Sequence, residues 1–135
     1  MIMSKLYKGF IETKGKASIE KLKNRTTWKT YDEVKNLNGF GGVLADDTIL
    51  IDIDDSDQSE ILMNIVEELQ LDCKVLCTSR GKHFLFKNHT IARNRTHVQL
   101  AVGLTADIKV GSKLSYEVIT VSYTHLRAHE TGRNL

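Results

Sequence analysis

The chain has 135 residues, of which 41% are hydrophobic and 27% are charged. This length and composition predict one globular domain with a single core. The formal net charge is only +2, so a nucleic-acid partner would have to bind a local basic surface rather than an overall basic field. No apolar run reaches membrane-spanning length, and the N-terminus lacks the apolar segment of a signal peptide. We therefore expect a cytoplasmic protein without a membrane partner.

The first half of the chain predicts one short helix, two strands and one longer helix. "TYDE" at residues 30–33 has the spacing of a capping box, which predicts a short helix through Leu37. "NGFGG" at 38–42 predicts a turn, and strands are expected at 43–45 and 48–54. Ser56 is the expected N-cap of a helix over 57–70, whose apolar residues fall on one face at helical spacing.

The second half of the chain is rich in predicted strands. They are expected at 74–78, 82–87, 97–102, 106–110 and 116–119. One strong helix packed across a mostly antiparallel sheet is an α+β fold. We therefore expect that fold class for the domain.

The stretch "TILIDIDDSD" at residues 48–57 joins an apolar strand to a group of carboxylates. On a strand, Asp52 and Asp54 point to the same face, and two adjacent carboxylates are suitable ligands for Mg²⁺ or Mn²⁺. The alternative is a capping cluster at the N-terminus of the next helix. We expect Asp57 to have this capping role, and the same role is an open alternative for Asp55. It does not explain two acids on one face at the end of an apolar strand.

A second polar element, "TSRGKHFLF" at residues 78–86, is a glycine-containing turn that leads into a strand. Backbone N–H groups of such a turn, with the side chains of Ser79, Arg80, Lys82 and His83 around them, are suited to a triphosphate. The alternative is a surface hairpin with incidental charges.

A third element, "ADIKVGS" at residues 106–112, places the isolated acid Asp107 in an apolar strand, with Lys109 on the same face. A structural salt bridge between them is the ordinary explanation. The functional explanation is a third metal carboxylate beside a phosphate-binding cation.

The order of these elements, within about sixty residues, resembles the three motifs of the archaeo-eukaryotic primase superfamily. The resemblance is strongest to the bifunctional primase–polymerase (prim-pol) domain of phage and plasmid replication proteins, and it covers roughly residues 41–119. It implies an RRM-like primase–polymerase catalytic core that is incomplete at its C-terminal end. The implied activity is DNA primase/polymerase chemistry, a metal-dependent nucleotidyl transfer from NTPs or dNTPs in DNA replication.

The same resemblance implies roles for individual residues. Two Mg²⁺ or Mn²⁺ ions would be held by Asp52, Asp54 and Asp107. His83 would contact the phosphates of the nucleotide, with weaker assignments of Ser79, Lys82 and Lys109 to the same triphosphate. The implied partners are a single-stranded DNA template and a helicase domain in the complete protein, in the host cytoplasm if the protein is phage-encoded. The template would lie along basic residues such as Arg93 and Arg95 or the N-terminal lysines.

Two interpretations from other classes stay open. One is another metal-dependent phosphoryl-transfer enzyme that shares only the D-x-D pair. The other is a non-catalytic nucleic-acid-binding module whose acidic residues are structural.

The end of the chain has a different character. "VSYTHLRAHET" at residues 121–131 resembles one reading frame of a transposase-type sequencing adapter. We therefore expect a partial prim-pol domain over residues 1–120 and a non-native tail over 121–135, which is left out of any site. The alternative is a genuine polar C-terminal helix.

Overall fold

The computed structural model describes residues 6–87, 94–100, 103–120 and 125–128, with residues 95–97, 120 and 125–128 described by their backbone alone. These residues form two sheets and two α-helices. In chain order, the elements are β1 (Tyr7–Lys14), β2 (Ala17–Ser18), α2 (Tyr31–Val34), β3 (Gly39–Leu44), β4 (Thr48–Ile53), α3 (Ser56–Glu68), β5 (Lys74–Cys77), β6 (Lys82–Lys87), β7 (Arg95–Gln99), β8 (Thr105–Val110), the 3₁₀ turn η1 (Gly111–Lys113), β9 (Tyr116–Thr120) and β10 (His125–Ala128). No helix in this described part of the chain is long and apolar enough to cross a membrane.

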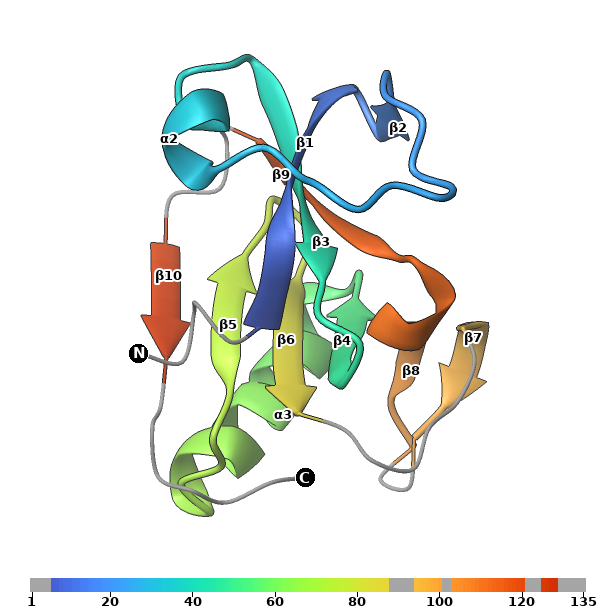
Figure 1. Ribbon diagram of the computed structural model, residues 1–135. Helices are drawn as coiled ribbons and strands as arrows, with labels where there is room; N and C mark the ends of the chain where they lie inside the picture. Colours follow the sequence, from blue (N-terminus) through green and yellow to red (C-terminus); the bar gives the residue numbers. More distant parts are fainter. Residues whose placement is uncertain (1–5, 88–93, 101–102, 121–124, 129–135) are drawn as a thin grey trace.

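The larger sheet has six strands in the order β10-β5-β6-β4-β8-β7 (Figure 1). Each neighbouring pair in it is antiparallel. With α3 packed against this sheet, the predicted α+β class with a mostly antiparallel sheet is confirmed. Strand β4 lies at the centre, between β6 and β8, so residues of three separate chain segments meet along its length.

Helix α3 covers one face of the larger sheet. Its buried residues Leu62, Met63 and Val66 share a core with residues of β4 such as Ile51. The helix begins at Ser56 because Asp55 is its N-cap, accepting a hydrogen bond from the Gln58 N–H at 2.9 Å. The prediction of Ser56 as the N-cap was therefore wrong by one residue. The capping role that was left open for Asp55 is confirmed.

The smaller sheet, in the order β2-β1-β3-β9, lies across the other face of the larger one (Figure 1). A second core cluster joins Leu6 and Leu44 from that side to Leu50 and Leu85 of the larger sheet. Residues of β4 thus alternate between the α3 side and the space between the sheets. This alternation places Asp52, two residues after Leu50, on the side that faces the smaller sheet.

The N-terminal part differs most from the sequence-based expectation. Residues 39–42, which were predicted to form a turn, belong to strand β3, and the strand expected at 43–45 is the end of β3. The β1–β2 hairpin was not predicted. Glycine is needed in β3 because a Cβ at Gly42 would lie 2.4 Å from the ring of Tyr7. By contrast, the capping box of Thr30 and Glu33 is present as predicted, although its helix ends at Val34.

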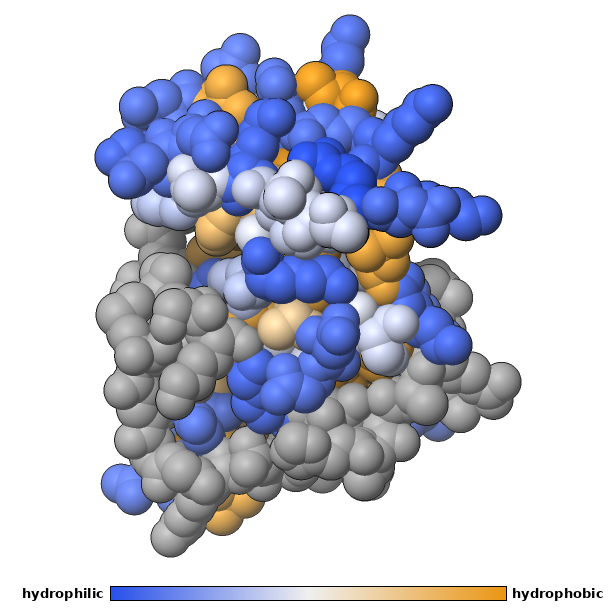
Figure 2. Space-filling model, in the orientation of Figure 1, coloured by the Kyte–Doolittle hydropathy of each residue, from blue (hydrophilic) through white to orange (hydrophobic). Residues whose placement is uncertain are grey.

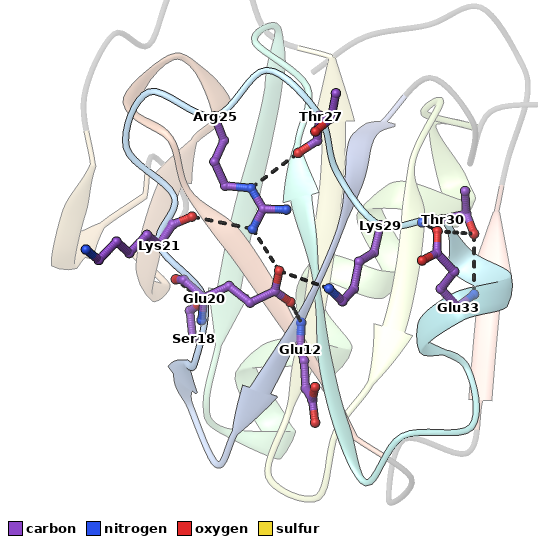
Figure 3. Close-up of polar contacts among 9 residues, drawn as sticks. All are labelled: Glu12, Ser18, Glu20, Lys21, Arg25, Thr27, Lys29, Thr30 and Glu33. Atoms are coloured by element: carbon purple, nitrogen blue, oxygen red, sulfur yellow. Dashed lines mark hydrogen bonds and ion pairs between the residues drawn. The ribbon is translucent and has the colours of Figure 1, made fainter.

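The segment between β2 and α2 is held by one carboxylate, that of Glu20 (Figure 3). It accepts a hydrogen bond from the backbone N–H of Glu12 in β1 and forms ion pairs with Arg25 at 2.7 Å and Lys29 at 3.3 Å. Arg25 also lies over the ring of Trp28, 4.9 Å from its centroid. Hydrophilic residues cover most of the surface in this part of the molecule, the upper part of Figure 2.

Part of the C-terminal region expected to be a non-native tail lies on the edge of the larger sheet. Residues His125–Ala128 form β10, which pairs with β5. The rest of that region lies outside the described residues.

Candidate functional site

Three predicted site residues form one row across the larger sheet. Asp52 of β4 lies opposite His83 of β6 on one side and opposite Asp107 of β8 on the other. Directly opposed residues of antiparallel strands project to the same face, with Cβ atoms about 5 Å apart. The Nε2 atom of His83 lies 3.6 Å from Oδ1 of Asp52. Three motifs that are far apart in the sequence therefore meet at neighbouring positions.

This row lies in a cavity of about 520 Å³. Six of the seven predicted site residues line it: Asp52, Asp54, Ser79, His83, Asp107 and Lys109. The structure adds Lys16 and Gly15 from the turn after β1, together with Val118, and Arg80 of the predicted triphosphate turn also lines the cavity. A second cavity of about 530 Å³ lies near the end of β1 and the loop before β3, and none of the predicted site residues line it.

Lys82 is the predicted site residue that the structure places elsewhere. Its ammonium forms a hydrogen bond with Ser59 at 3.1 Å and an ion pair with Glu60, both in α3. Lys82 and His83 are adjacent on β6, and successive strand residues point to opposite faces. Because His83 faces the cavity, Lys82 faces the helix, so its assignment to the triphosphate is corrected to a contact between β6 and α3.

The turn that carries Ser79 is held against the end of β4. The backbone N–H of Thr78 donates to the Gly81 carbonyl at 3.0 Å, and the Gly81 N–H donates to the Thr78 hydroxyl at 3.1 Å. A Cβ at Gly81 would lie 1.8 Å from the backbone oxygen of Ile53. This glycine therefore allows the turn to approach the strand that carries Asp52, which is a packing role.

The electrostatics of the row favour a bound cation. Burial raises the pKa of Asp52 above its ordinary value. A protonated His83 and the charge of Lys109 act in the opposite direction, whereas the charges of Asp54 and Asp107 raise the pKa further. A divalent cation would relieve both the desolvation and the repulsion among these carboxylates.

The carboxylates at the cavity fit a metal ion that also coordinates water and substrate phosphates. Asp54 is paired with Arg80 at 2.5 Å, and within the described residues no three carboxylate, imidazole or thiolate groups already surround one point. Asp52 and Asp107 lie opposite each other with carboxylate oxygens beside the cavity. Mg²⁺ is commonly held by one or two carboxylates together with water and substrate phosphates. The residues present therefore fit a cation that binds together with a phosphate ligand.

Cationic groups lie on the rim of the same cavity. The Tyr116 hydroxyl donates to the Lys16 carbonyl at 2.9 Å and accepts from the Ser18 N–H at 3.2 Å, which fixes the β1–β2 hairpin at the rim. The ammonium of Lys109 lies 5.8 Å from the centroid of the Tyr116 ring. Lys16 was predicted only as one of several lysines for a template. Of the two arginines in that prediction, Arg93 and the side chain of Arg95 lie outside the described residues.

Sequence reasoning missed a buried polar group behind the row. Glu117 of β9 is fully buried, and its Oε2 lies 2.7 Å from Nδ1 of His83. Its other oxygen accepts a hydrogen bond from the Tyr7 hydroxyl and lies 3.7 Å from the ammonium of Lys74. The one available signal was an acid inside an apolar strand, the same kind of signal that singled out Asp107.

The chain matches no family model, no curated protein and no solved structure. The assignment of a function therefore depends on the residues of the cavity and on the order of their motifs.

Proposed function

We propose that the protein is a metal-dependent nucleotidyltransferase of the DNA primase/polymerase kind. The observation that supports this proposal best is the row of His83, Asp52 and Asp107 in one cavity, with Lys109 and Lys16 at its rim. Acids beside cations suit a ligand that carries both a metal and phosphates.

Each group has a distinct task in this proposal. Asp52 and Asp107 would hold the Mg²⁺ or Mn²⁺ ions. Asp54 would join them once its ion pair with Arg80 is broken. Bound there, the metal would activate a 3′-hydroxyl and stabilise the leaving pyrophosphate. Lys109, Lys16 and the Ser79 turn bind and orient the triphosphate, and Nε2 of His83 is the imidazole atom directed toward it.

The finer assignment comes from the motif resemblance alone. It supplies the primase/polymerase activity, the single-stranded DNA template, the helicase domain of the complete protein and a role in phage or plasmid replication. The cavity itself favours the coarser part of the proposal, a metal–triphosphate ligand.

Calorimetric titration with a nucleoside triphosphate, with and without Mn²⁺, tests this proposal. The wild type should bind in a Mn²⁺-dependent manner, and the double variant Asp52→Asn/Asp107→Asn should lose at least tenfold in affinity, about 1.4 kcal/mol. Asp46→Asn is the matched control, because Asp46 is an exposed acid that precedes the other end of β4 and pairs with Lys8. Its affinity should stay within about twofold of the wild type.

Metal-independent binding, or equal binding by a folded double variant, would contradict the proposal. Metal-free binding of a DNA oligonucleotide by both proteins would then favour the non-catalytic nucleic-acid-binding module.

A further inference from the structure

A cluster of buried ionisable side chains lies between the two sheets, directly behind the candidate site. The side chains of Glu117, Lys74 and His83 are 0%, 3% and 8% exposed, respectively. The ammonium of Lys74 donates to the Tyr7 hydroxyl, which in turn donates to Glu117. The cluster thus forms a continuous path from Lys74 to His83, and His83 is the one member that lines the cavity.

Stability alone is a weak explanation for this cluster. Removing an ammonium and a carboxylate from water carries a large desolvation penalty, and apolar residues of similar size in such places are often neutral or stabilising. Ionisable side chains with strongly perturbed environments are enriched at functional sites. The contact of the cluster with His83 connects it to the cavity.

We propose that Glu117 is the positioning residue for His83. Its carboxylate holds the imidazole with Nδ1–H directed at Glu117 and Nε2 directed at Asp52 and the cavity. The consequence for nucleotide binding rests on the proposed function, whereas the orientation of the ring does not.

The hydrogen-bond chemistry of the pair assigns the proton. Burial alone would raise the pKa of Glu117, but the hydrogen bond from His83 and the charge of Lys74 outweigh burial and hold this pKa below its ordinary value. An ionised carboxylate can only accept hydrogen bonds. At 2.7 Å, Nδ1 of His83 must therefore be the donor, and this bond fixes both the tautomer and the orientation of the ring.

Lys74 and Tyr7 hold the carboxylate in place from the side opposite His83. Lys74 lies on β5, and its ammonium is 4.4 Å from the centroid of the Tyr7 ring. Because the two residues bind the Oε1 atom of Glu117, Oε2 is left for the imidazole. The carboxylate therefore has one orientation toward His83.

The orientation can be measured by ¹⁵N NMR of the imidazole nitrogens in the full chain, with His83→Asn used to assign the signals of His83. In the wild type, Nδ1 of His83 should give the shift of a protonated nitrogen, because the Glu117 carboxylate 2.7 Å away accepts its hydrogen bond. The double variant Glu117→Leu/Lys74→Met removes both charges together, so no unpaired buried charge remains. In it, the proton should move to Nε2, the form that a free imidazole prefers in water.

The conservative variant Glu117→Gln should retain the protonated Nδ1, because its amide oxygen can still accept that hydrogen bond. An unprotonated Nδ1 in the wild type would overturn the proposal without any variant. A protonated Nδ1 that persists in the folded double variant would overturn it as well.

Nucleotide affinity separates this inference from the proposed function. With Mn²⁺ and a nucleoside triphosphate, the double variant should bind about tenfold more weakly than the wild type, because its ring is no longer held with Nε2 toward the cavity. Nε2–H can donate to a phosphate oxygen while Glu117 accepts from Nδ1–H of the same doubly protonated ring, and Glu117→Gln should lie between the wild type and the double variant. If the wild type binds no nucleotide, the proposed function fails, and the NMR result still decides the role of Glu117. If the wild type binds and the folded double variant binds equally well, the positioning role is overturned.

Discussion

Asp52 of β4 lies directly opposite Asp107 of β8, so two carboxylates face the same cavity from adjacent central strands. Like charges directly opposite each other destabilise an antiparallel pair. The fold therefore keeps a repulsive pair at this position, and a cation that binds there converts the repulsion into attraction. The stability of the protein and its ligand affinity are thus expected to change in opposite directions when either acid is neutralised.

Asp52→Asn should raise the stability of the protein without ligands. The raised pKa of Asp52 means that its charged form is disfavoured in the folded state. At neutral pH, the melting temperature should rise by about 2–4 °C, as measured by thermal denaturation.

The pH dependence of that gain has a definite sign. As the pH falls through the raised folded pKa of Asp52, the wild type binds the proton and its repulsion disappears. The advantage of the variant should therefore shrink on acidification and vanish below the ordinary aspartate pKa, about 3.9. Asp46→Asn, at an exposed position, should show no such gain, and a lower melting temperature for Asp52→Asn would contradict the account.

Substitution of Lys109 should lower nucleotide affinity, whereas substitution of Lys82 should not, because the structure places the two side chains on opposite faces of the sheet. Lys109→Met should weaken Mn²⁺-dependent triphosphate binding about tenfold, as expected for a lost contact between a charge and a phosphate. Lys82→Met should leave the affinity within about twofold and change the free energy of unfolding by about 1 kcal/mol or less, since its partner Glu60 is exposed. Equal losses of affinity in the two variants would show that the assignment of the faces is wrong.

Gly81→Ala should destabilise the protein by about 3 kcal/mol or more, since the added Cβ would meet the backbone at Ile53 rather than a movable side chain. Chemical denaturation measures this loss. Gly15→Asn is the matched control: Gly15 has φ of +61° with open space around its Cβ position, and asparagine tolerates that conformation. The control should change stability by about 1 kcal/mol or less. A tolerated alanine at Gly81 would contradict the close approach of the turn to β4.

Glu20→Gln should lower the free energy of unfolding by about 1–2 kcal/mol at neutral pH, because the charge-assisted bonds from Arg25 and Lys29 are lost. Burial opposes the ionisation of Glu20, yet the hydrogen bond from the Glu12 N–H and those from Arg25 and Lys29 hold its pKa below the ordinary value. The stabilisation is therefore present above the ordinary glutamate pKa, about 4.3, and is lost as the pH falls through the lowered folded pKa.

Urea denaturation of the wild type and Glu20→Gln at a series of pH values measures this difference. It should disappear in acid, and Glu68→Gln, an exposed control in α3, should show little effect at any pH. A difference that does not depend on pH would argue against the ionised cluster around Glu20.

Local patterns predicted much of the fold. The strand at 82–87 follows from its apolar run, and the helix after Asp55 follows from apolar residues at helical spacing. The secondary structure of the N-terminal half was predicted less well. Its glycines at 39–42 are typical of a turn, but close packing against neighbouring residues, such as that of Gly42 against Tyr7, favours glycine in a strand here. Strand β1 was missed because its apolar residues lie among lysines and a glycine.

Most residues of the site were predicted from the sequence, but their positions relative to one another were not. The opposition of Asp52 to both His83 and Asp107 depends on strand register, which one sequence does not specify. Strand alternation could have shown that Lys82 and His83 do not face one cavity together. The contact of Glu117 with His83 joins two different sheets, and no local pattern predicts it.

The location of the metal tests the central claim most directly. Mn²⁺, added with a nucleoside triphosphate, broadens the NMR signals of nearby backbone amides, so the broadening identifies where it binds. The account predicts that the amides of Asp52, Asp107 and His83 broaden first, while that of Asp46, beyond the other end of β4, remains sharp. Broadening centred elsewhere, or spread evenly over exposed acids such as Asp46 and Asp57, would contradict the proposed site.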